Sequence, residues 1–189
     1  MEKVIDLSII IVSFNTKKLL IDCINSIRRH VGGLKYEVII IDNGSSDGST
    51  QAISNIKHQS SNLPAGRHGF KLIENKENLG FGKANNQGMK IAKGRYILLL
   101  NSDTLISSNV LGEMISWMGE HKDVGIASCS LKNKDGSIQG TGGYFPTLAR
   151  VFSWMTIQDL PFVDNIIKPF HPMHTKSFYK EEEIYKSEK

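Results

Sequence analysis

The stretch RYILLLNSDT, residues 95–104, decides how the fold is interpreted. Its aliphatic core, ILLL, is typical of a strand that is covered on both faces of a parallel sheet. The chain then turns abruptly polar at Asn101, Ser102 and Asp103. In open parallel sheets, ligands bind beyond the carboxyl ends of the strands. The stretch therefore predicts either a buried strand that ends in an ordinary loop, or a rigid arm that holds the Asp103 carboxylate at a binding site.

Apolar and amphipathic segments alternate along the rest of the chain. Nearly continuous apolar runs predict strands over residues 7–14, 36–41, 70–74, 95–100 and 124–128. Apolar residues at helical spacing predict helices over residues 16–30, 80–93 and 107–121. This alternation predicts an α/β fold with a mostly parallel sheet and helices on both faces.

The connecting segments give further local expectations. Residues 58–69 are polar and contain proline and glycine, which predicts a surface loop. The Asp135-Gly136 pair predicts a small β-hairpin over residues 131–139. Gly94 stands where the C-cap of the helix over residues 80–93 belongs.

Length and composition indicate one soluble globular domain. The chain has 189 residues, of which 40% are hydrophobic and 22% charged, and its net charge is +4. This mild basic excess suits a phosphate-bearing ligand, but no cluster of lysine and arginine is dense enough to predict nucleic-acid binding. The two cysteines make no disulfide framework, and Cys23 falls on an apolar helical face. With no apolar run of about 18 residues, the sequence predicts a cytoplasmic protein, with the inner face of the cell membrane as the alternative.

Small, polar and acidic residues follow four of the predicted strands, which predicts a ligand crevice at one side of the sheet. Each residue alone has a structural explanation. Asp42 and Asp103 suit turns, and Asp47 suits a helix N-cap. A dinucleotide fingerprint would need a third glycine where Asn85 stands, so NAD binding is disfavoured.

Together these segments resemble glycosyltransferase family 2, the GT-A (Rossmann-like) fold of nucleotide-sugar transferases. The resemblance is carried by SIIIVSFN, EVIIIDNGSSDGS, NLGFGKANNQGMKIAKGRYILLLNSDT and DGSIQGTGGYFP, in the expected order. The subgroup is similar to the rhamnosyltransferase-like enzymes that build bacterial cell-surface polysaccharides. The resemblance implies a nucleotide-sugar-binding domain over residues 6–146. Residues 147–189 would then be an incomplete acceptor-side segment with a charged tail.

The resemblance also implies an activity and its cofactor. The chain would move a sugar, with inversion, from a UDP- or dTDP-sugar to a hydroxyl of a glycan or lipid-linked acceptor. Mg²⁺ or Mn²⁺ would neutralise the departing diphosphate. Asp103 matches the metal-binding carboxylate of the family's D-x-D motif, and Asn101 stands at its first position without adding charge.

The remaining site residues follow from the same resemblance. Asp42 would accept a hydrogen bond from the base or ribose, and Lys83 would meet a phosphate, although an ordinary solvated lysine is an equal alternative. The expected nucleotide-sugar-binding residues are Ser13, Asn15, Asp42, Asn43, Asn78, Gly80, Phe81, Lys83, Asn101 and Asp103.

The chain departs from the family pattern in its last part. No Glu-Asp motif that would supply a general base follows Pro146; only Asp159, Asp164 and the charged run 181–183 stand there. A truncated or non-catalytic nucleotide-sugar-binding module is therefore the alternative function. A sugar-phosphate nucleotidyltransferase is less favoured, because the first strand lacks a glycine-rich loop after it. The apolar helical face in residues 147–170 predicts core or acceptor-site wall, with peripheral membrane contact as the alternative.

Overall fold

The computed structural model describes residues 4–60, 68–139, 148 and 152. The chain divides into two compact units, residues 1–125 and 126–189, which are considered separately. The domain boundary predicted between residues 146 and 147 and the acidic residues named beyond it lie outside the described residues, and the boundary stays a prediction.

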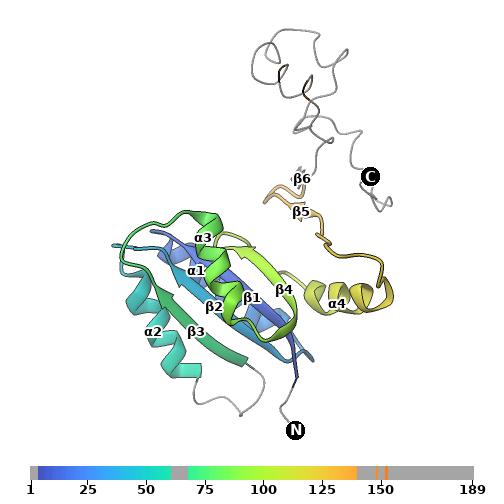
Figure 1. The fold of residues 1–189 in the computed structure, drawn as a ribbon, viewed down its shortest axis with the longest axis horizontal. Coiled ribbons are helices and arrows are strands. Elements are labelled where there is room, and N and C mark those ends of the chain that lie inside the picture. The colour runs from blue at the N-terminus through green and yellow to red at the C-terminus, as the bar shows by residue number, and fades with distance from the viewer. Residues whose placement is uncertain (1–3, 61–67, 140–147, 149–151, 153–189) are drawn as a thin grey trace. The chain divides into compact units, whose positions relative to one another are not determined.

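The first unit is an α/β structure built on a parallel sheet (Figure 1). Its elements in chain order are β1 (Ile5–Ser13), α1 (Lys17–His30), β2 (Tyr36–Asp42), α2 (Ser49–Ser60), β3 (His68–Glu74), α3 (Phe81–Ile91), β4 (Gly94–Asn101) and α4 (Val110–Glu120). The sheet order is β3-β2-β1-β4, and each neighbouring pair is parallel. The predicted fold class is confirmed, and the four predicted strands within the sheet lie within two residues of their expected bounds.

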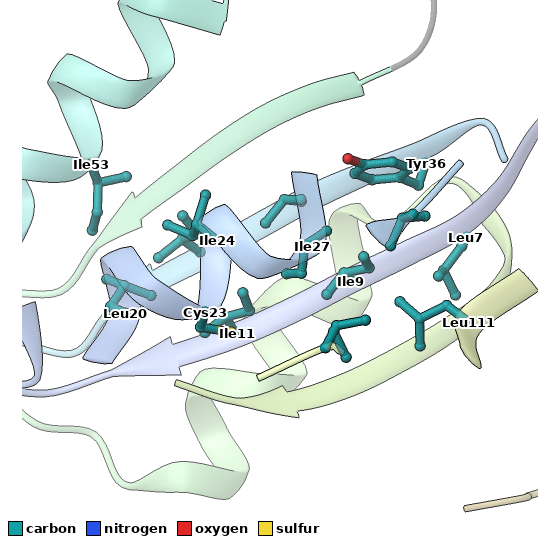
Figure 2. Packing of buried hydrophobic residues seen from close by; sticks show 14 residues of the cluster. Leu7, Ile9, Ile11, Leu20, Cys23, Ile24, Ile27, Tyr36, Ile53 and Leu111 are labelled. Atoms are coloured by element: carbon teal, nitrogen blue, oxygen red, sulfur yellow. The ribbon is translucent and has the colours of Figure 1, made fainter. Parts of the chain in front are cut away.

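The larger part of the core lies on the sheet face that α1, α2 and α4 cover (Figure 2). Alternate residues of β1 and β2, among them Ile9 and Ile40, meet Leu20 and Ile24 of α1 there and are almost completely buried. Side chains point alternately to opposite faces of a strand, so the residues between them face the other way.

Helix α3 covers that second face of the sheet. Its Ala84 packs against Ile10, Ile39 and Ile41, and all four side chains are fully buried. A Cβ added to Gly88 would lie 2.7 Å from Cγ2 of Ile10, so the glycine lets the helix approach the strands closely. Helices therefore cover both faces of the sheet, as predicted.

Strand β4 differs from the prediction that it is covered on both faces. It is an edge strand of the four-stranded sheet in the described part of the chain. Its residues alternate in burial, and Ile97 and Leu99 remain 46% and 47% exposed. These two side chains share a face with Ile10 of β1, but α3 packs over β1 and β2 and leaves them open.

Three local predictions were wrong. Residues 124–128 form no strand, and Ile126 is 93% exposed, because an isolated apolar run cannot form a sheet without a neighbouring strand to pair with. Gly94 begins β4, and the C-cap of α3 is Ala92 in an extended conformation. Helix α2 continues to Ser60, so the predicted loop begins later, and residues 61–67 lie outside the described part.

The predicted hairpin is confirmed within the second unit. Strands β5 (Leu131–Lys132) and β6 (Ile138–Gln139) pair antiparallel, and Asp135 accepts a hydrogen bond from the Ser137 N–H in the turn. None of the helices in the described ranges has the length and apolar character needed to span a membrane.

Because α3 approaches the sheet closely, we expect alanine at two of its glycines to change the free energy of unfolding in opposite directions. Gly88→Ala should lower the free energy of unfolding by about 1–2 kcal/mol, because overpacking against the β-branched Ile10 exceeds the gain in helix propensity. Gly82→Ala, whose Cβ would meet nothing within 4 Å, should raise it by up to about 1 kcal/mol. Urea unfolding of both variants measures these changes; equal effects would contradict the packing described for Gly88.

Candidate functional site

The strand order places a topological switch point between β1 and β4. The chain proceeds from β1 outward to β2 and β3, and then returns to add β4 on the other side of β1. Ligands of open α/β sheets bind at such points, beyond the carboxyl ends of the strands. All the predicted site residues lie at the ends of these strands, in the loops that follow them or in the first turn of α3, since parallel strands end at the same edge.

The loops after β1 and β2 are held against each other through Asn15. This residue has a positive φ of 54°, which Asn tolerates better than most residues. Its side-chain oxygen accepts the Ser46 N–H at 2.8 Å, and its own N–H donates to the Ser45 hydroxyl at 2.9 Å. The backbone of the first loop is thereby fixed by the second.

Asp47 joins the starts of two helices. Its carboxylate accepts the N–H of Ser49, the first residue of α2, at 3.0 Å, and the N–H of Lys17, the first residue of α1, at 2.9 Å. The Ser49 hydroxyl bond and the Lys17 N–H bond hold the pKa of Asp47 below its usual value. Asp47 was predicted to be the N-cap, but Gly48 stands at that position, and Asp47 accepts an N–H at the start of each helix from one residue further out.

Asp42 ends β2 with an unsatisfied carboxylate oxygen. The residue is 2% exposed, and its Oδ2 accepts hydrogen bonds from the Thr50 hydroxyl at 2.9 Å and the Ser45 N–H at 3.2 Å. Its Oδ1 is buried without a hydrogen-bond partner among the described residues. Because a buried, unpaired carboxylate oxygen is costly, this atom is a candidate acceptor for a ligand N–H or O–H, which would reach it after a local movement of the atoms that cover it.

Four amide side chains hold the loop between β3 and α3. Asn75 and Gln87 exchange two hydrogen bonds, at 2.9 and 3.0 Å, and Asn75 also donates to Asn43 Oδ1 at 3.0 Å. Asn43 Nδ2 in turn donates to Asn78 Oδ1 at 2.6 Å. We call these residues the amide network. It joins the end of β2, the end of β3, the connecting loop and the middle of α3.

The amide network also positions the start of α3. Asn43 Oδ1 accepts the Leu79 N–H at 3.1 Å, and Asn78 Oδ1 accepts the Gly80 N–H at 2.9 Å. Gly80, the N-cap, has a φ of 81°, which favours glycine. Phe81, the first helical residue, is 58% exposed, and Lys83 is exposed as well. The amino end of α3 therefore faces solvent at the same edge as Asp42.

The turn after β4 is tied to the first loop by hydroxyl groups. The Thr104 N–H donates to the Asn101 carbonyl at 3.1 Å, and the Ser102 and Thr16 hydroxyls lie 3.1 Å apart. Thr16 is in turn 2.9 Å from the Ser13 hydroxyl. Asp103 is exposed beside this chain of hydroxyls. The structure thus brings the D-x-D-like turn next to the loop after β1.

The donor set around Asp103 fits a divalent ion only with help from a ligand. No group of three or more His, Cys, Asp or Glu side chains comes together within the described ranges. Mg²⁺ and Mn²⁺ prefer oxygen ligands, and Mg²⁺ is commonly held by one or two carboxylates together with substrate phosphates. One exposed carboxylate at the switch point fits this arrangement.

The predicted residues therefore form one connected edge, and the structure adds others that the sequence analysis missed. The additions are Thr16, Ser45, Thr50, Asn75, Gln87 and Ser102. Gln87 had a detectable signal, because it shares the apolar face of α3 with Ala84 and Ile91, where a polar side chain needs a partner. The binding roles of all these residues stay predictions.

The profile of Glycosyl transferase family 2 matches residues 8–180, which is most of the chain. The chain belongs to this family. Among curated members, Glycosyltransferase GlyG of Streptococcus pneumoniae serotype 4 is 25% identical over 131 residues, which cover 69% of this chain and 40% of that protein. The poly(ribitol-phosphate) beta-glucosyltransferase of Bacillus spizizenii is 33% identical over 107 residues, covering 56% of this chain and 16% of that protein.

Solved structures of glycosyltransferases share the fold of this family 2 chain. S. aureus TarS 1-349 in complex with UDP-GlcNAc matches with a TM-score of 0.53 at 22% identity, over 68% of this chain and 39% of that one. The mannosyltransferase PcManGT from Pyrobaculum calidifontis, in complex with GDP-Man and Mn²⁺, matches with a TM-score of 0.55 at 18% identity, over 70% and 37%. The family 2 chain spans less than half the length of the curated relatives it matches.

Cys23 lies beneath this edge and gives a test of the packing there. Its thiol is fully buried and lies 3.8 Å from the Asn101 carbonyl. Burial, and secondarily the negative charge of Asp103, raise the pKa of Cys23 to about 12. Because this folded-state pKa exceeds the unfolded value of 9.0, the neutral thiol stabilises the fold below about pH 9, and the contribution is lost as the pH rises toward 12.

We expect a disulfide reagent at pH 8 to modify Cys129, which is half-buried, and to leave Cys23 unmodified. Only the thiolate reacts, and the raised pKa leaves Cys23 with about a thousandfold less thiolate than an unperturbed thiol. Thiol titration with and without guanidinium measures this, and the Cys129→Ser variant isolates Cys23. Rapid native labelling of that variant would contradict the buried position.

Proposed function

We propose that this chain carries the donor-binding part of a glycosyltransferase, which moves a sugar from a nucleotide-diphosphate sugar to a hydroxyl acceptor. The observation that carries the proposal is the meeting, at one sheet edge, of a buried carboxylate with an unsatisfied oxygen and an exposed carboxylate. Asp42 supplies the first and Asp103 the second. Such an edge suits a ligand with hydrogen-bond donors at one end and a diphosphate at the other.

Each part of the edge has a distinct task in this proposal. Asp42 Oδ1 accepts an N–H or O–H of the base or ribose, and the loops around Ser13 and Asn15 wall the base. The amide network sets the loop of Asn78 and Gly80 over the nucleotide. Phe81 covers the ligand, and Lys83 together with the free N–H groups at the start of α3 offers positive charge to a phosphate.

Asp103 would hold the divalent ion, Mg²⁺ or Mn²⁺, with Asn101 beside it as a neutral hydrogen-bonding group. When bound, the ion acts as a Lewis acid that stabilises the negative charge on the departing diphosphate. The Mn²⁺ in the PcManGT complex supports this assignment. The UDP-GlcNAc bound by TarS supports a UDP-sugar as donor, with a dTDP-sugar as the alternative.

The relatives also indicate the setting of the reaction. One relative is a poly(ribitol-phosphate) beta-glucosyltransferase, so its acceptor is a polymer. We therefore propose a glycan or lipid-linked acceptor and a role in cell-surface polysaccharide synthesis, in the cytoplasm or at the inner face of the membrane. A non-catalytic nucleotide-sugar-binding module is the second candidate, because the residues brought together at this edge are ones proposed to bind the donor.

The metal role of Asp103 is tested with Asp103→Asn. We expect wild-type protein to bind UDP more tightly with MnCl₂ than without it, and the variant to lose about tenfold or more of that gain, because the amide adds no charge to the site. Calorimetric titration of UDP, dTDP and GDP measures the affinities. Asp22→Asn, which changes an exposed carboxylate paired with Lys18, serves as the control and should bind as wild type. An unchanged metal effect in Asp103→Asn would refute the assignment.

Asp42→Asn should behave differently from Asp103→Asn. Loss of a hydrogen bond to a charged acceptor costs about 1.5–3 kcal/mol, which corresponds to an affinity about 10–100-fold lower. The loss should be the same with and without MnCl₂, since Asp42 acts on the base or ribose. If the loss appeared only with the metal present, Asp42 would belong to the phosphate end of the site and the orientation proposed for the nucleotide would be wrong.

A further inference from the structure

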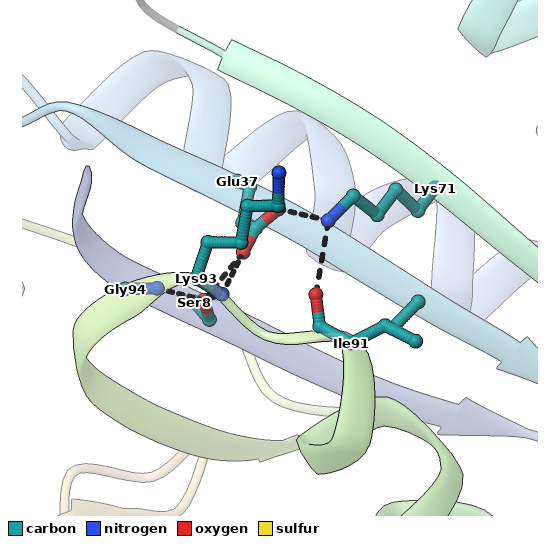
Figure 3. Close-up of polar contacts among 6 residues, drawn as sticks. All are labelled: Ser8, Glu37, Lys71, Ile91, Lys93 and Gly94. Atoms are coloured by element: carbon teal, nitrogen blue, oxygen red, sulfur yellow. Dashed lines mark hydrogen bonds and ion pairs between the residues drawn. The ribbon is translucent and has the colours of Figure 1, made fainter. Parts of the chain in front are cut away.

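A second polar cluster lies at the opposite end of the sheet, beneath the carboxyl end of α3 (Figure 3). Glu37 of β2 accepts hydrogen bonds from the Ser8 hydroxyl and the Lys93 N–H, each at 2.7 Å, and pairs with Lys71 Nζ at 2.7 Å. Ser8 Oγ also accepts the Gly94 N–H at 2.8 Å, and Lys71 Nζ donates to the Ile91 carbonyl at 3.0 Å. We call Ser8, Glu37 and Lys71 the Glu37 cluster.

The Glu37 carboxylate is deeply buried and nevertheless charged. The residue is 2% exposed, in register with Ser8 of β1 and Gly69 of β3. Burial by itself would raise the pKa of Glu37, but the hydrogen bonds from Lys71, Ser8 and the Lys93 backbone outweigh it and hold the pKa below its usual value. The Glu37 carboxylate therefore stays ionised in the physiological pH range, with Lys71 Nζ 2.7 Å away.

The partners of the cluster are the backbone groups where α3 ends. Lys71 Nζ donates a hydrogen bond to the carbonyl of Ile91, the last helical residue, where a cation also interacts favourably with the helix dipole. Just beyond the helix, Glu37 accepts a hydrogen bond from the Lys93 N–H, and Ser8 accepts one from the Gly94 N–H. Gly94 sits so close to β1 that an added Cβ would clash with the Ser8 backbone. The helix end is thus held in one position over the sheet.

Helix α3 connects this cluster to the candidate site. Its 11 residues span about 16 Å, with the Glu37 cluster under one end and the amide network beside the other. Glu37 lies near the start of β2, and Asn43 directly follows its end. Between these two residues, Ile39 and Ile41 of β2 pack against Ala84 of the helix. A rigid helix that is fixed at both ends has little freedom to slide along the strands.

We propose that Glu37 is a positioning residue for the nucleotide site: by fixing the carboxyl end of α3, it sets where Gly80, Phe81 and Lys83 stand at the other end. The proposal rests on the nucleotide-diphosphate binding proposed above. A contribution to stability alone does not explain the cluster well, since well-packed apolar residues often replace buried ion pairs without loss of stability. Apolar side chains in place of Ser8, Glu37 and Lys71 would not supply the directional hydrogen bonds that fix the end of α3.

The test compares Glu37→Gln with Ile53→Val in the full 189-residue chain. Ile53 is buried in the core on the opposite face of the sheet, so its variant loses stability without touching α3. Hydrogen exchange followed by mass spectrometry should show residues 78–91 exchanging about tenfold faster in Glu37→Gln than in Ile53→Val. The Kd for UDP in MnCl₂ should rise about three- to tenfold in Glu37→Gln and stay unchanged in Ile53→Val.

A double-mutant cycle with Lys71→Met tests whether the pair acts as a unit. Lys71→Met alone leaves the Glu37 carboxylate buried without its cation, so it should loosen α3 more than the Glu37→Gln/Lys71→Met double variant does. Additive effects would overturn the proposal, as would Glu37→Gln matching Ile53→Val in both exchange and Kd. If Glu37→Gln does not fold, Ser8→Ala, which removes the acceptor of the Gly94 N–H, takes its place with the same expectations.

The two proposals fail in different ways. If wild-type protein binds none of UDP, dTDP and GDP in MnCl₂, the proposed function is wrong, and the exchange of residues 78–91 still decides whether Glu37 fixes α3. If wild-type protein binds and Glu37→Gln binds equally well despite faster exchange, the positioning of the nucleotide site by Glu37 is overturned and the proposed function stands.

Discussion

Burial of β1 and β2 on both faces is the constraint on which the rest of this structure depends. Ile9, Ile10, Ile39 and Ile40 have no exposed surface, so a slip of one residue in either strand would move buried side chains to the wrong face. The ladder continues past the strand ends, where the Asn43 N–H donates to the Ser13 carbonyl at 2.8 Å. The loops that form the candidate site therefore start from backbone positions that the core has already determined.

Helix α3 positions the loop before it, which contains Asn78 and Gly80 and which belongs to no strand. Its Ala84 and Gly88 lie close to apolar side chains of the sheet, whereas polar side chains from β2 and neighbouring segments hold both of its ends. Apolar contact is non-directional and fixes how near the helix lies. Hydrogen bonds are directional, and they fix its position along the strands.

Features that depend on a few neighbouring residues were predicted correctly from the sequence. The aliphatic runs placed β1 to β4 correctly, and the change to polar residues at Asp42 and Asp103 located the edge, because each signal lies within a few residues. The segment 124–128 failed because an apolar run becomes a strand only beside a partner, which the run itself does not specify. The covered face expected for β4 failed likewise, because covering elements come from elsewhere in the chain. The pairing of Asn75 with Gln87 was missed because it depends on how α3 is set on the sheet.

The amide network has a consequence for how the edge responds to its surroundings. Asn43, Asn75, Asn78 and Gln87 carry no charge and do not titrate. The shape of the loop they hold is therefore insulated from changes in proton concentration and in ionic strength, both of which act on charged groups. Acidity and salt therefore act at this edge through its charged side chains, among them Asp42 and Asp47, while the loop that the amide network holds keeps its form.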